Sequence, residues 1–129
     1  MKSLVSGLLL ALCSSLSFSV SAKDTVKIAY IGPLTGGVSA NGIGGRNSAD
    51  LAVRLKNQDP NAKYKYELVS ADDECKPNVG VQVATKIASD SSIIAGVTHY
   101  CSAVAMSTVD VYHKFGLPVM VWRSEERRV

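Results

Sequence analysis

Hydrophobic and polar residues alternate in several short stretches of this chain, a pattern that predicts β-strands. Residues 25–31 alternate and then run apolar, residues 64–71 repeat the alternation, and residues 92–97 form a brief β-branched run. A further apolar run at residues 119–122 follows the sequence FGLP, whose glycine and proline interrupt regular structure. We therefore expect four strands.

The segments between these strands carry apolar residues at helical spacing. The first predicted helix begins at Gly42 and ends before Pro60, which cannot continue it. The second begins at Pro77, since proline is favoured in a first helical turn, and runs to about residue 90. The third covers residues 102–114. The residues expected on the apolar faces are Ile43, Ala49, Ala52, Val53 and Leu55 in the first helix, Val79, Val83, Ala84 and Ile87 in the second, and Val104, Met106, Val109 and Tyr112 in the third.

This alternation of strands and helices predicts an α/β fold, a Rossmann-like parallel sheet flanked by helices, because short connections between such units favour right-handed crossovers. In an open parallel sheet, ligands bind outside the carboxyl ends of the strands. The loops expected there are residues 33–41, 72–76 and 98–102.

The first 22 residues have the features of a secretory signal peptide: one early lysine, a short apolar run at residues 8–12 and a serine-rich end. We expect cleavage after Ala22 and a soluble, periplasmic product, because the apolar run is shorter than the roughly 20 residues of a spanning helix. Cys13 does not suit lipid attachment, since Leu12 precedes it in place of a small residue.

Cleavage would leave two cysteines, Cys75 and Cys101, in an oxidising compartment, and we expect them to form a disulfide. Each lies just after a predicted strand, at the same edge of the sheet. A catalytic Cys101 with His99 as its base is a less favoured alternative. A metal site that adds His113 is also disfavoured, because the spacings match no common zinc motif. We expect His113 to be solvated near a helix end, and we assign no role to His99.

The charge pattern argues against several other functions. A net charge of +3 without a basic patch gives no reason to expect a nucleic acid partner. The acids Asp72, Asp73 and Glu74 lack acidic partners after the first strand, so we interpret them as solvated loop residues that hydrogen-bond the turn. The run GIGG at residues 42–45 does not follow the G-x-G-x-x-G order of nucleotide sites. We expect no metal and no cofactor.

Residues 123–129, RSEERRV, carry five charges and contain no cap or turn signal. We interpret this tail as foreign to the fold, the result of a frameshift or of joined adapter sequence, and the chain as a fragment.

Three stretches together resemble the start of a periplasmic solute-binding protein of the branched-chain amino acid type: KIAYIGPLTGG, then ELVSADDECKPNVGVQVATKI, then IIAGVTHYCSAVAMSTVDVYHKFGLPVM. The resemblance covers about residues 25–122. It implies a two-lobed protein that delivers amino acids or related small solutes to the membrane permease of an ABC transporter, without catalysis. Residues 23–122 would then be the first part of the N-terminal lobe, which we expect to bind weakly or not at all alone.

The resemblance also implies roles for individual residues. Ser102 matches the serine that contacts the α-carboxylate of the ligand; its other expected role is to cap the third helix. Tyr100 matches a position that faces the apolar end of the ligand, and the Cys75–Cys101 disulfide is shared. Asn41 stands where leucine-type members have an aromatic residue, which favours a more polar ligand. We expect a monomer.

Two alternatives from other classes remain. One is an exported enzyme with a Rossmann-like core, although neither a nucleophile elbow nor a G-x-G-x-x-G turn is present. The other is the ligand-sensing domain of an extracellular receptor, which would use the same lobe.

Overall fold

Four parallel strands form one sheet in the order β2-β1-β3-β4 in the computed structural model, which describes residues 23–123. The elements are β1 (Thr25–Gly32), α1 (Ser39–Gln58), β2 (Lys65–Asp72), α2 (Pro77–Ala88), β3 (Ile93–Thr98), α3 (Ser102–Phe115) and β4 (Val119–Val121). The predicted order and parallel direction are confirmed. The expected signal peptide and residues 124–129 lie outside the described residues.

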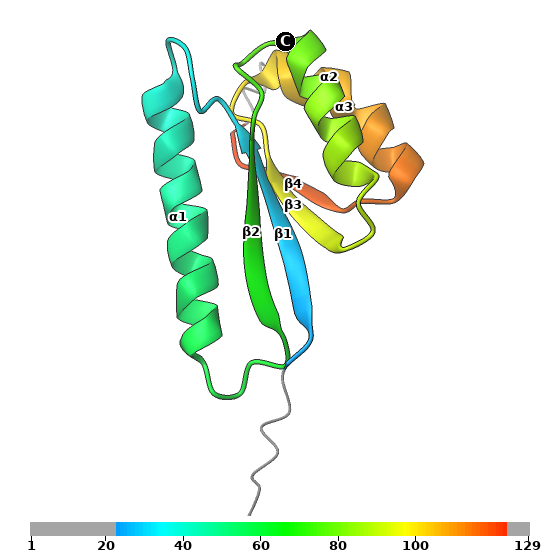
Figure 1. Cartoon of the computed structure of the whole chain (residues 1–129). Coiled ribbons are helices and arrows are strands. Elements are labelled where there is room, and N and C mark those ends of the chain that lie inside the picture. The colour runs from blue at the N-terminus through cyan, green and yellow to red at the C-terminus, as the bar shows by residue number, and fades with distance from the viewer. Residues whose placement is uncertain (1–22, 124–129) are drawn as a thin grey trace, which may run out of the picture.

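The helices form two layers, with α1 on one face of the sheet and α2 and α3 side by side on the other (Figure 1). β1 lies in the middle of the sheet, paired along its whole length with β2 and over much of its length with β3. The α/β, Rossmann-like fold class is therefore confirmed.

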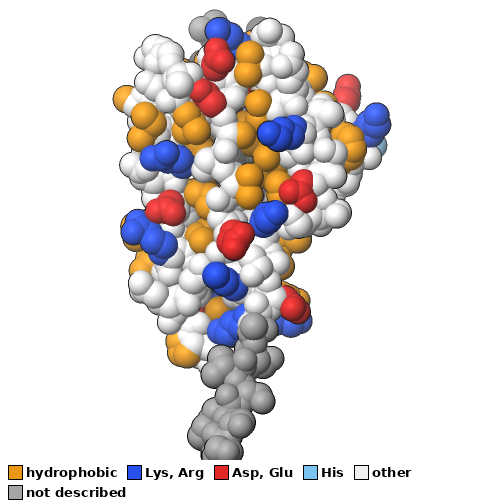
Figure 2. Space-filling model, viewed as in Figure 1, with side chains coloured by type: hydrophobic (Ala, Val, Ile, Leu, Met, Phe, Trp, Pro, Cys, Tyr) orange, Lys and Arg blue, Asp and Glu red, His pale blue; other side chains and the backbone are white. Residues whose placement is uncertain are grey.

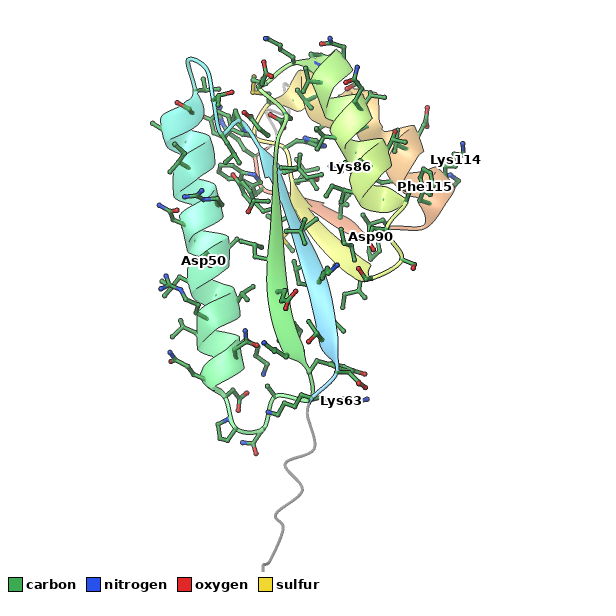
Figure 3. The ribbon with its side chains drawn as sticks, viewed as in Figure 1. Asp50, Lys63, Lys86, Asp90, Lys114 and Phe115 are labelled. Atoms are coloured by element: carbon green, nitrogen blue, oxygen red, sulfur yellow. A yellow bond between two sulfur atoms is a disulfide. The ribbon has the colours of Figure 1, made fainter. Side chains whose placement is uncertain are left out.

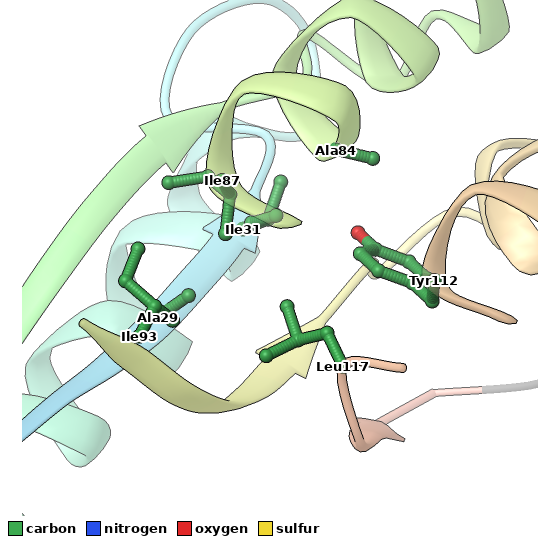
Figure 4. Packing of buried hydrophobic residues seen from close by; sticks show 7 residues of the cluster. All are labelled: Ala29, Ile31, Ala84, Ile87, Ile93, Tyr112 and Leu117. Atoms are coloured by element: carbon green, nitrogen blue, oxygen red, sulfur yellow. The ribbon is translucent and has the colours of Figure 1, made fainter. Parts of the chain in front are cut away.

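The hydrophobic core lies between the sheet and the pair α2 and α3 (Figure 4). Strand residues there face α2, while the ring of Tyr112 and Leu117 close the layer from the side of α3. The buried members are Ala29, Ile31, Ala84, Ile87, Ile93, Tyr112 and Leu117. The predicted apolar face of α2 is confirmed, since Ala84 and Ile87 are buried.

The predicted apolar face of α1 is largely wrong. Ile43 and Leu55 are 38% and 57% exposed, and Ala52 is also exposed. The face that meets the sheet instead combines Gly42 and Gly45 with Ala49 and Val53, at intervals of three to four residues. A Cβ atom on residue 42 would lie 1.9 Å from the carbonyl oxygen of Pro33, so this contact requires glycine. The helix also begins three residues earlier than predicted, at Ser39.

The predicted apolar face of α3 is partly wrong. Val104 and Tyr112 are buried, but Met106 and Val109 are 76% and 55% exposed. Thr108 takes the place between Val104 and Tyr112, four residues from each. A threonine can be buried there because its hydroxyl donates to the carbonyl of Val104 at 3.0 Å.

The charged side chains lie mainly on the outside. On the face in Figure 2, lysine, arginine and acidic side chains are interspersed, and no area of one sign dominates. Asp90, labelled in Figure 3, accepts hydrogen bonds from the amide and hydroxyl of Ser92 in the turn that starts β3. Its carboxylate also lies 3.8 Å from the amine of Lys27 on β1. Asp90 therefore stabilises the turn before β3.

Candidate functional site

The loops after β1 and β2 are joined by Asp72, the last residue of β2. Its carboxylate accepts from the amide of Leu34 at 2.8 Å, from the hydroxyl of Thr35 at 2.5 Å and from the amide of Glu74 at 2.8 Å. Burial raises the pKa of this carboxyl, but the hydrogen bonds outweigh burial, so the pKa lies below its usual value. The expectation that these acids hydrogen-bond the turn holds for Asp72.

The expectation that Asp72, Asp73 and Glu74 are all solvated is wrong, because Asp73 is fully buried. Its Oδ2 atom lies 2.8 Å from Nδ1 of His99, which is also fully buried. Nε2 of the same ring lies 2.8 Å from the hydroxyl oxygen of Tyr112 on α3. His99, which has no role in the sequence-based prediction, is thus the middle of a buried chain of three polar side chains.

Burial raises the pKa of the Tyr112 hydroxyl most, and the negative charge of Asp73 raises it further. The hydroxyl therefore stays protonated at neutral pH and can donate a hydrogen bond to the imidazole.

Cys75 and Cys101 form the expected disulfide, with their Cα atoms 5.6 Å apart. The backbone is left-handed near this disulfide in both loops: φ is +51° at Glu74 and +57° at Cys75 in the loop after β2, and +53° at His99 in the loop after β3. Such values are uncommon for residues other than glycine. The alternative of a catalytic Cys101 is contradicted, because a bonded sulfur is no nucleophile.

Ser102 is the first residue of α3, while Cys101 occupies the N-cap position. The expected capping role of Ser102 is therefore wrong by one residue. The helix nevertheless begins at the carboxyl edge of the sheet, where the partial positive charge of its first turn suits an anionic group. Ser102 is half-buried.

Tyr100 is half-buried and packs against Trp122, which follows β4. Their ring centroids are 5.2 Å apart at an angle of 45°. Trp122 in turn contacts Tyr30 on β1, with centroids 6.3 Å apart. Trp122 thus connects the half-buried ring of Tyr100 to the fully buried ring of Tyr30, and the sequence prediction missed both Trp122 and Tyr30.

Tyr30 points from the sheet toward α1 and donates a hydrogen bond to the carbonyl of Gly42 at 2.7 Å. Burial is the main cause that raises the pKa of Tyr30 to about 12, with a smaller contribution from Asp73. A groove between α1 and the sheet runs beside this ring. It is lined by Tyr30, Gly44, Gly45, Ser48, Ala49, Val97 and Trp122.

Asn41 is exposed in the first turn of α1, not in the preceding loop as predicted. It therefore lies on the α1 side of the sheet, while Ser102 begins a helix that covers the other side. Both residues follow the carboxyl end of a strand, β1 and β3 respectively.

Residues 23–123 contain no group of three or more histidine, cysteine or acidic side chains that could hold a metal ion. His113 is exposed in the last turn of α3, as expected. Within the same range, no helix is both long and apolar enough to cross a bilayer.

A family model described as "Periplasmic binding protein" matches residues 25–128. The chain belongs to the periplasmic binding protein family. It is 34% identical over 109 residues to the leucine-, isoleucine-, valine-, threonine- and alanine-binding protein of Pseudomonas aeruginosa, with 84% of this chain and 29% of that protein covered. It is 32% identical over 111 residues to the Leu/Ile/Val-binding protein of Escherichia coli K12, with 84% and 30% covered.

Solved structures agree on the fold. A branched-chain amino acid transporter substrate-binding protein of Streptococcus pneumoniae, in complex with isoleucine, superposes with a TM-score of 0.69 at 25% identity, over 74% of this chain and 28% of that one. A type 1 periplasmic binding protein of Bordetella pertussis gives a TM-score of 0.70 at 28% identity, over 75% and 26%. The chain thus spans about 30% of the length of its curated relatives and corresponds to part of one lobe.

Proposed function

We propose that this chain is the first part of the N-terminal lobe of an exported solute-binding protein that captures an amino acid or a similar small polar solute for an ABC transporter permease. The observation that carries the proposal is the start of α3: the disulfide ties the residues just before Ser102 to the neighbouring loop, at the edge of the sheet where such folds bind ligands. The named relatives are amino-acid-binding proteins, which supports this function over the enzyme alternative.

In this proposal, the Ser102 hydroxyl and the positive end of α3 bind the ligand carboxylate, and Tyr100 contacts the other end of the ligand. The aromatic surface of Tyr100 and Trp122 supplies an apolar wall. Asn41, exposed at the start of α1, favours a polar group in the ligand side chain. The second lobe would close over this surface by a hinge. The protein would be periplasmic and monomeric.

The test is calorimetry on the full-length protein that contains this lobe, with a panel of leucine, threonine, glutamine and asparagine. We expect Ser102→Ala to weaken binding of every bound amino acid by roughly 10- to 150-fold, the value of a hydrogen bond to a charged group. Ser107→Ala is the matched control, because this serine is exposed on the same helix and donates to the carbonyl of Val104. Equal affinities for the two variants would refute the role of Ser102.

The 129-residue chain alone provides a second measurement. We expect no saturable binding of these amino acids at micromolar concentration, because residues from a second lobe would complete the site. Micromolar binding by this chain would contradict the assignment to a partial lobe.

A further inference from the structure

Two independent links join the loop after β2 to the loop after β3. The disulfide joins Cys75 to Cys101, and the hydrogen bond between carboxylate and imidazole joins Asp73 to His99. Both links connect residues 26 positions apart, and each partner of the second lies two residues before the corresponding cysteine. The hydrogen-bonded link therefore repeats the connection made by the disulfide, one step closer to the sheet.

The hydrogen-bonded link rests on β1, which lies between the two strands. The amide of Asp73 donates to the carbonyl of Gly32 at 3.2 Å, and the amide of His99 donates to the carbonyl of Ile31 at 2.8 Å. Both residues thus extend the backbone hydrogen bonding of the sheet, on opposite sides of β1. Their side chains meet across the end of this strand, and nothing in that arrangement requires the disulfide.

Every polar group of the link has a partner. Oδ1 of Asp73 accepts from the amide of Cys75 at 2.9 Å, and Oδ2 faces Nδ1 of His99. Because a carboxylate only accepts, Nδ1 carries a proton, and in the neutral imidazole Nε2 accepts from the hydroxyl of Tyr112. Asp73 and His99 have no exposed surface and Tyr112 is 5% exposed. Water therefore does not compete for these hydrogen bonds, and the loss of one partner would leave another buried group unsatisfied.

We propose that Asp73, His99 and Tyr112 are positioning residues that form a second, non-covalent lock, which keeps residues 100–102 in place when the Cys75–Cys101 disulfide is reduced. The inference rests on the proposed function, because those residues are the ones assigned to ligand contact. The lock also maintains the left-handed backbone of His99, which a free loop would leave for a more favourable conformation.

The chemical event is reduction of the disulfide by dithiothreitol. The S–S bond takes up two electrons and two protons to give two thiols, while dithiothreitol is oxidised to its cyclic disulfide. The lock contains no sulfur, so its hydrogen bonds persist after reduction. The two thiols therefore stay close to each other and the start of α3 does not move.

The test uses the 129-residue chain, oxidised and reduced, and does not involve a ligand. Hydrogen exchange is followed at the amides of residue 99, bonded to Ile31, and of Val104, bonded to the carbonyl of Cys101. In the wild type, we expect reduction to change these exchange rates by less than about threefold. In Asp73→Asn and His99→Gln, we expect reduction to raise them by at least roughly tenfold, as loss of a buried hydrogen bond implies.

The control for His99→Gln is His113→Gln, since His113 is exposed on α3, and this variant should behave as the wild type does. If Asp73→Asn or His99→Gln does not fold, Tyr112→Phe is used in its place, because phenylalanine keeps the aromatic ring and lacks only the hydroxyl. This variant should also show faster exchange on reduction. The tautomer gives an independent reading: long-range 1H–15N spectra should show the proton of His99 on Nδ1.

Three results would overturn the lock. One is wild-type exchange that accelerates on reduction as much as in the variants. Another is that the amides of the variants stay protected from exchange after reduction. The third is a His99 ring that is protonated on Nε2 and not on Nδ1. Because none of these measurements uses a ligand, they are distinct from failure of the proposed function, which would appear only as absent amino acid binding by the full-length protein.

Discussion

Val104 lies so close to Gly80 that a Cβ atom on residue 80 would be 2.2 Å from Cγ1 of Val104. Gly80 is buried on α2, and Val104 is fully buried in the first turn of α3. The two helices therefore pack at a distance that only glycine allows at this point. Since α3 carries the candidate ligand-binding residue at its first position, this contact helps to set where that position lies.

Gly80→Ala should lower the free energy of unfolding by about 1–2 kcal/mol, because overpacking of the interface costs more than the helix propensity of alanine returns. Gly44→Ala is the matched control: residue 44 lies within a helix, and a Cβ atom added there would have no neighbouring heavy atom within 4 Å. At this position we expect stabilisation by about 0.5–1 kcal/mol. Urea unfolding of the two variants measures both values, and equal shifts would contradict a close approach of α2 and α3.

The pH dependence of stability should depend on Asp72. The pKa of its carboxyl is lowered in the folded protein from the ordinary value of 3.8. The contribution of this group to stability is therefore complete above the unfolded-state pKa and is lost as the pH falls through the lower folded-state pKa. Asp72→Asn should destabilise the protein at about pH 7, and the difference from the wild type should shrink as the pH falls below about 4.

Chemical denaturation across this pH range measures the effect. Asp110→Asn is the control, because it makes the same substitution at an exposed position on α3. A difference between Asp72→Asn and the wild type that stays constant down to pH 2 would show that the hydrogen bonds from the β1 loop do not favour the charged carboxylate.

The sequence was sufficient to predict the order of the elements and the disulfide, because both depend on local periodicity and on which strand ends are neighbours. It was not sufficient to predict the burial of Asp73. An acidic triplet after a strand is usually solvated, and only a partner 26 residues away, itself buried, makes the opposite arrangement stable. The available signal was that Asp73 and His99 each directly follow strands that flank the same central strand.

The error on α1 has a different origin. Helical spacing of large apolar residues predicts a face that includes Ile43 and Leu55. The helix instead approaches the sheet at Gly42 and Gly45, and the hydroxyl of Tyr30 on β1 donates to the carbonyl of Gly42. Apolar periodicity contains no information on such close backbone contacts. For the same reason the aromatic contacts of Trp122 could not be predicted, because its partners Tyr100 and Tyr30 come from distant parts of the chain.

Tyr30→Phe should lower the free energy of unfolding by about 0.5–1.5 kcal/mol at neutral pH, because it removes the buried hydrogen bond to Gly42. The substitution should also change how stability depends on pH above pH 10. The pKa of Tyr30 is raised to about 12 from 10.0, so its contribution to stability is complete below pH 10 and is lost as the pH rises through 12. The variant should lose less stability over that range, as measured by fluorescence-detected unfolding. Tyr66→Phe, on the edge strand β2, is the control.

Removal of the disulfide should destabilise the chain without displacing the loops. On the entropic model, a loop of 26 residues contributes about 3.5 kcal/mol. We therefore expect the double variant Cys75→Ser, Cys101→Ser to have a free energy of unfolding that is lower by that amount, as measured by urea denaturation.

In the same double variant, the native amide signals of residue 99 and Val104 should persist at urea concentrations below the unfolding transition, because the lock does not depend on sulfur. The triple variant that adds His99→Gln should lose those signals before global unfolding. If the double variant already loses them at zero urea, the disulfide alone positions the start of α3.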